Sequence, residues 1–194
     1  LSYESFFIST ALASLISVII IFIIRVDYSK SSQISNEKNF LELLENKKLK
    51  LICLIMFLVG GSFLTCLNFT AVFSKSISVV PITIFFLSYT IIALIMRIFF
   101  GWLPDKYGQV TFCKPALIFY GISIGVLGVS SNFIGVMIAG LLFGVSHALV
   151  YPSIYTLALR FSDISNKSKA FSICSVSFTS GGMIFSVIYG LIAE

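Results

Sequence analysis

Six long apolar stretches dominate this chain and restrict its fold more than any other feature. A helix that crosses about 30 Å of hydrocarbon needs roughly 20 largely apolar residues. Six segments reach or approach that length: residues 6–24, 51–74, 82–100, 115–131, 133–159 and 170–193. Only 11% of the 194 residues are charged, against about 25% in a typical soluble domain. The sequence therefore predicts an all-α integral membrane protein with six transmembrane helices.

The basic residues are distributed unevenly between the two sides of these stretches. Of the 13 Lys and Arg residues, all except Lys75 fall in segments on one side. Because Lys and Arg are enriched in cytoplasmic loops, we expect the N-terminus outside and the basic loops in the cytoplasm. The net charge of +5 does not indicate nucleic-acid binding, since no basic cluster is interleaved with polar aromatic residues.

Small residues and prolines mark expected features of the helices. Pro81 and Pro115 are expected to open helices, and Pro152 is expected to kink the fifth span. We expect Gly121, Gly125 and Gly128 to let neighbouring helices approach closely. In the polar segment 25–50, an apolar face predicts a short surface helix; a partly ordered linker fits equally well. That face comprises Phe40, Leu41, Leu43 and Leu44.

No catalytic or metal site is evident. The four cysteines, Cys53, Cys66, Cys113 and Cys174, lack the paired spacing of zinc sites or disulfide frameworks, so we interpret them as small core residues. The sequence contains one histidine, no paired carboxylates and no Ser/His/Asp set, which argues against a membrane enzyme. We expect no cofactor. Between Leu51 and Gly190 no span carries an Asp or Glu within the membrane, so these residues do not indicate a coupling mechanism, and proton coupling is left as an alternative.

The most specific stretch lies between the third and fourth spans. It reads Gly101-x-Leu103-x-Asp105-Lys106-x-Gly108, with Arg97 four residues earlier. It resembles the cytoplasmic loop motif of the major facilitator superfamily, G-x-L-x-D-R-x-G-R-R. Lys106 replaces the usual Arg, and Gln109 stands where a basic residue is usual.

A second stretch supports the same resemblance. Gly140-x-x-x-Gly144-x-x-His147-x-x-x-Tyr151-Pro152 is similar to the tenth helix of efflux-type members. The resemblance implies helices six to eleven of a twelve-helix bundle. Residues 1–24 would be the last helix of the N-terminal half, 25–50 the cytoplasmic central linker, and 51–194 the C-terminal half without its final helix. We therefore expect a fragment of a transporter in the bacterial cytoplasmic membrane, whose partners are the lipid bilayer, a small-molecule substrate and the remaining helices.

The resemblance implies a cytoplasmic gate at the loop motif. Gly101 and Gly108 would allow a tight turn and close helix approach. We hypothesise that Asp105, paired with Arg97 or Arg160, latches the cytoplasmic side in the outward-open state. The alternative is that Asp105 only shapes the loop and sets the topology.

The resemblance also places the seventh and tenth helices around a central cavity. Asn68, His147 and Tyr151 are then cavity candidates, and Tyr89 is a further one for which ordinary packing is the alternative. An ionisable residue within a membrane span is a functional hypothesis by default. His147 would bind substrate or carry a proton; alternatively, it is a neutral side chain bonded to a neighbouring helix.

These observations predict a secondary active transporter that works by alternating access and exports a small organic solute or drug. Uptake or antiport of a metabolite or organic anion is the alternative within transport. A truncated, non-transporting membrane remnant or scaffold is the alternative from another class.

Overall fold

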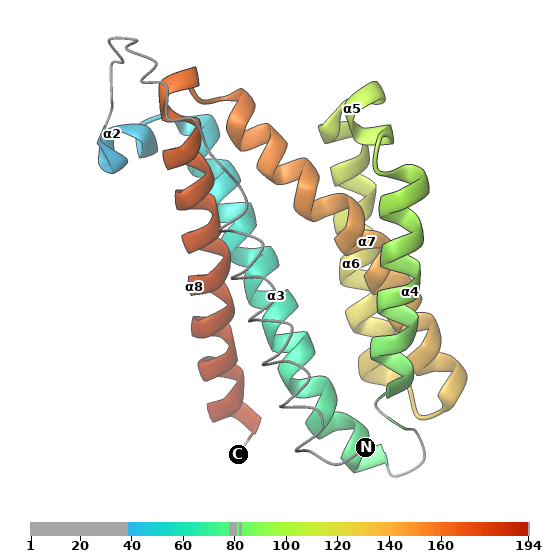
Figure 1. Ribbon diagram of the computed structural model, residues 1–194. Helices are drawn as coiled ribbons and strands as arrows, with labels where there is room; N and C mark the ends of the chain where they lie inside the picture. Colours follow the sequence, from blue (N-terminus) through green and yellow to red (C-terminus); the bar gives the residue numbers. More distant parts are fainter. Residues whose placement is uncertain (1–38, 78–80, 82, 194) are drawn as a thin grey trace, which may run out of the picture. The chain divides into compact units, whose positions relative to one another are not determined.

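The computed structural model describes residues 39–77, 81 and 83–193 (Figure 1). These residues belong to a compact unit, Asn36–Glu194. The first expected span, 6–24, and most of the expected linker lie outside the described residues. Within the described ranges, the regular secondary structure is entirely helical.

Five long helices account for most of the described chain. They are α3 (Lys47–Ile77), α4 (Thr83–Phe100), α6 (Gln109–Val129), α7 (Phe133–Arg160) and α8 (Lys167–Ala193). Each contains a stretch long and apolar enough to cross a membrane. Three short elements, α2 (Phe40–Leu44), α5 (Leu103–Tyr107) and η1 (Ile164–Asn166), precede or connect them. The five spans predicted after residue 50 are thereby confirmed as helices.

Four of the five long helices pack as two parallel pairs, and the fifth, α6, packs on one of these pairs. α3 lies along α8, α4 lies along α7, and α6 packs on α7. The first pair and α6 run in one direction, while α4 and α7 run in the other (Figure 1). The ends adjoining α5 and η1 therefore lie on the same side, as the distribution of basic residues predicted.

Reciprocal glycine contacts join α3 to α8. A Cβ atom added to Gly60 would lie 2.0 Å from the carbonyl oxygen of Phe178, and one added to Gly181 would lie 1.9 Å from that of Phe57. Both distances are far shorter than any van der Waals contact. The two backbones therefore touch without intervening side chains, as small residues permit between membrane helices.

Glycines also bring α4 and α7 into close contact. Cβ atoms added to Gly140 and Gly144 would lie 2.1 Å from Ser88 Oγ and 2.6 Å from the Tyr89 carbonyl oxygen, respectively. By contrast, Gly121, Gly125 and Gly128 of α6 are exposed, with no described atom within 4 Å of an added Cβ. Within the described residues they bring no two helices together, contrary to expectation, because α6 turns another face to α7. Buried on α6 are Ala116, Tyr120, Ser123 and Leu127.

Helix α6 begins earlier than predicted. Gly108 ends α5 and precedes α6 with φ 99°, so the helix starts at Gln109 and Pro115 lies inside it. The expectation that Pro115 opens the helix was wrong. A proline in the second turn removes the hydrogen bond to the Thr111 carbonyl, and its ring crowds that carbonyl. Pro152 lies inside α7, as predicted.

The short surface helix predicted before α3 is present as α2. Its first turn is capped because the Asn39 amide donates to Glu42 Oε2 at 3.1 Å. Leu43 is buried among residues of α3, α7 and α8, whereas Phe40 is 54% exposed. The apolar face of α2 is therefore partly occupied by the helix bundle itself.

Candidate functional site

The loop motif folds into α5 and the two turns that flank it. A Cβ added to Gly101 would lie 2.5 Å from the Arg97 carbonyl oxygen, and Gly108 has a positive φ of 99°. Such a φ is readily adopted only by glycine. Both motif glycines are therefore required by the backbone path between α4 and α6.

Asp105 is exposed, and its partner is uncharged. Gln109 Nε2 donates to Asp105 Oδ1 at 3.2 Å, and Gln109 itself is 2% exposed. In the described part of the chain, neither Arg97 nor Arg160 is paired with Asp105; both are exposed in the last turns of their helices. Gln109, which stands where the motif usually has a basic residue, is therefore the residue that binds Asp105.

The other motif side chains support the turn. Lys106 Nζ lies 5.2 Å from the ring centroids of both Trp102 and Tyr107, within reach of a cation–π interaction. Leu103 is half-buried at the start of α5. The 101–109 segment thus forms α5 and its two flanking turns, and both arginines lie outside it.

Four aromatic side chains form a stripe along α7. Phe143, His147, Tyr151 and Tyr155 are four residues apart and therefore share one face of the helix. Successive ring centroids lie 6.5, 5.4 and 4.8 Å apart.

Three other helices contribute rings to this stripe. Phe63 of α3 stacks on His147 with centroids 4.2 Å apart, and Tyr89 of α4 lies 6.1 Å from the same ring. Phe178 of α8 lies 5.4 Å from Tyr151. We call these residues, without Tyr155 at the end of the stripe, the aromatic cluster: Phe63, Tyr89, Phe143, His147, Tyr151 and Phe178. It unites three of the four predicted cavity residues.

His147 is the polar exception at the centre of the cluster. It is 6% exposed, and its Nδ1 has no hydrogen-bond partner among the described residues. Tyr151 Oη instead donates to Tyr155 Oη at 3.4 Å, which in turn lies 2.9 Å from Ser175 Oγ. A buried polar atom without a partner costs about 1–3 kcal/mol. Nδ1 is therefore a hydrogen-bonding position that the protein leaves open.

Comparison with known families identifies the chain. The family model described as Major Facilitator Superfamily matches residues 1–186. The chain belongs to the major facilitator superfamily. It is thus a multi-pass integral membrane protein of a transporter family, and the family is not one of enzymes. Searches of curated proteins and of solved structures found no match.

Asn68 lies apart from the aromatic cluster in this superfamily member. It is exposed on α3, and its Nδ2 donates to Ser186 Oγ of α8 at 3.3 Å. The structure therefore gives Asn68 a bond between helices rather than a place beside His147.

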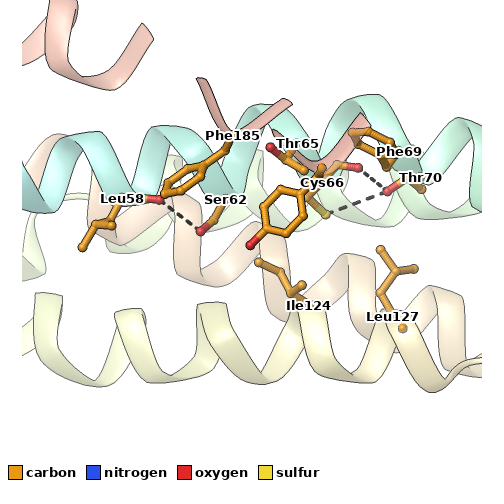
Figure 2. A pocket seen from close by; sticks show the side chains of 11 residues that line it. Leu58, Ser62, Thr65, Cys66, Phe69, Thr70, Ile124, Leu127 and Phe185 are labelled. Carbon is orange, nitrogen blue, oxygen red and sulfur yellow. Dashed lines mark hydrogen bonds between the residues drawn. The ribbon is translucent and has the colours of Figure 1, made fainter. Parts of the chain in front are cut away.

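A separate pocket of this transporter-family protein lies between α3, α6 and α8, with a volume of about 460 Å³ (Figure 2). Ser62 Oγ donates to the Leu58 carbonyl at 3.0 Å and Thr70 Oγ1 to that of Cys66, so these hydroxyls are satisfied within α3. None of the four predicted cavity residues lines this pocket. Its walls come from helices far apart in sequence, so local patterns did not indicate it. The lining residues are Leu58, Ser62, Thr65, Cys66, Phe69, Thr70, Ile124, Leu127, Gly128, Phe185 and Tyr189.

Proposed function

We propose that this protein is a secondary active transporter that works by alternating access and exports a small organic solute bound at the aromatic cluster. The observation that carries the proposal is the open Nδ1 of His147, buried among rings from four helices. An ionisable side chain within a membrane span is a functional hypothesis by default, and His147 is the ionisable residue whose open atom lies among these rings.

The cluster favours a flat aromatic solute. Its rings offer stacking surfaces, and His147 offers one hydrogen-bonding nitrogen. The six residues of the aromatic cluster include no carboxylate and no Lys or Arg. This composition supports a planar organic molecule over a metabolite anion, which would need a cationic partner.

Ethidium, a planar aromatic dye, is a suitable first probe. Cells that express the chain and are loaded with ethidium should lose fluorescence faster than cells with an empty vector. A protonophore should abolish the difference if an ion gradient drives export. Equal rates with and without the chain, for ethidium and for neutral planar dyes, would count against this function.

We propose that the segment 97–109 faces the cytoplasm and acts as a gate, on the basis of the Lys and Arg distribution. Asp105 then holds α5 to α6 through Gln109 in one state, and the bond breaks in the other. A charge-assisted hydrogen bond at an exposed site contributes little to overall stability, so its removal should alter the balance between states more than folding.

Asp105→Asn keeps an acceptor oxygen but removes the charge that strengthens the bond to Gln109, so it should slow ethidium export several-fold while leaving the thermal unfolding midpoint within about 2 °C of wild type. The measurement pairs initial efflux rates with melting of the purified protein. Glu45→Gln removes an exposed carboxylate near the start of α3 and serves as the control, with no expected change. Unchanged export by Asp105→Asn would leave Asp105 as a loop-shaping residue only.

A further inference from the structure

Two cysteines that are 121 residues apart in sequence meet between α3 and α8. The Sγ atoms of Cys53 and Cys174 lie 3.8 Å apart, and both residues are buried. The other two cysteines, Cys66 and Cys113, are also free and buried, but neither contacts a described thiol. The chain therefore contains one thiol pair and two isolated thiols within the same membrane region.

The helix packing permits a bond between the paired sulfurs. A disulfide needs about 2.05 Å between the sulfur atoms, so they must approach by about 1.8 Å. α3 and α8 are already in backbone contact two turns further along, at Gly60 and Gly181. Because the helices run parallel and closely packed from this contact, side-chain rotation together with a small helix adjustment can supply the approach.

A cavity gives small molecules a route to one of the two sulfurs. It has a volume of about 530 Å³ and is lined by Lys47, Lys50, Leu51, Cys53, Leu54 and Ser177. The two lysines are exposed in the first turn of α3. Cys174 is 0% exposed and does not line the cavity. Small molecules in this cavity therefore have access to Cys53 but not to Cys174.

We propose that Cys53 and Cys174 form an oxidative modification site, at which a hydroperoxide generates a disulfide that joins α3 to α8. The Cys53 thiolate attacks one peroxide oxygen, the O–O bond breaks, and an alcohol or water leaves after it takes up a proton. The resulting Cys53 sulfenic acid is attacked by the Cys174 thiol, which loses its proton as water departs from the Cys53 sulfur. In total, two thiols lose two protons and two electrons, and one hydroperoxide takes them up to give an alcohol (or water) and a second water.

The test treats the protein in its membranes with tert-butyl hydroperoxide, blocks the remaining thiols with N-ethylmaleimide under denaturing conditions, and maps all four cysteines by mass spectrometry. The expected result is a peptide pair linked through Cys53 and Cys174, released by a reductant, with Cys66 and Cys113 alkylated as in untreated protein. In a Cys174→Ser variant, Cys53 should instead form a sulfenic acid that dimedone traps.

The wild-type map decides the proposal even if that variant does not fold. The isolated thiols Cys66 and Cys113 act as internal controls in the same molecule. If Cys53 and Cys174 remain as fully alkylated as these two after treatment, or if Cys53 is linked to a cysteine other than Cys174, the proposal is wrong.

Discussion

Gly181→Ala should strongly destabilise the helix bundle. The new methyl group would lie 1.9 Å from the Phe57 carbonyl oxygen, and a backbone atom cannot move aside as a flexible side chain can. Overpacking of a tight contact typically costs about 1–3 kcal/mol, and here α3 and α8 must separate along their length. We expect a clear fall in the thermal unfolding midpoint in detergent and a smaller monodisperse fraction in size-exclusion chromatography.

Matched substitutions separate this contact from a general sensitivity of helix glycines. Gly60→Ala should cause a similar loss, because its methyl group would meet the Phe178 carbonyl oxygen at 2.0 Å. Gly125→Ala on α6 should not destabilise the protein, since no described atom lies within 4 Å of the new carbon and alanine favours the helix. Equal midpoints for all three variants would contradict the packing described for α3 and α8.

His147→Phe should reduce ethidium export by at least about tenfold, the effect of losing about 1.4 kcal/mol of binding. Phenylalanine can keep the ring stacked on Phe63, but it lacks the open nitrogen. The folded protein should be as stable as wild type or more stable, because a buried polar atom without a partner is removed. Initial efflux rates and the unfolding midpoint should be measured on the same preparations.

Tyr120→Phe is the control for this variant. The hydroxyl of Tyr120 is likewise buried without a partner in the described chain, and its ring stacks on Phe143 at 4.9 Å. Its removal should leave export unchanged, because the phenylalanine ring keeps the contact with Phe143 and the hydroxyl is not part of the proposed binding site. Wild-type export by His147→Phe would reduce His147 to a packing residue and remove the main support for the proposed binding site.

Much of the fold could be predicted from local patterns. A membrane span is encoded in its own stretch of apolar residues, so each helix after residue 50 was found, and all except the start of α6 lay within about four residues of the predicted ends. Which glycines contact a neighbour depends on the face that each helix turns inward. That face is set by helices distant in sequence, which is why the close contacts of Gly140 and Gly144 with α4 were not predicted, and why Gly121, expected to approach a neighbour, has no described atom near an added Cβ.

For the candidate site, too, the sequence grouped residues of one helix but did not indicate which residues of other helices lie beside them. His147 and Tyr151 are four residues apart on one helix, so the pattern indicated a shared face. Phe63 and Phe178 come from other helices and gave no local signal. The Cys53–Cys174 pair was missed for the same reason. The Gln109 contact had a signal in its four-residue spacing from Asp105, but Gly108 interrupts the helix between them.

The most direct test of the account asks whether Tyr151 lines a path that opens to both sides of the membrane. Tyr151→Cys, in a protein whose four native cysteines are replaced by alanine, should be treated with a membrane-impermeant maleimide from outside or from the cytoplasm. The exposed positions Ser131 and Lys106, each changed to cysteine, report one side each, and the fully buried Ala139→Cys reports background. The account predicts labelling of Tyr151→Cys from both sides. Labelling from one side only, or from neither, would contradict alternating access at the aromatic cluster.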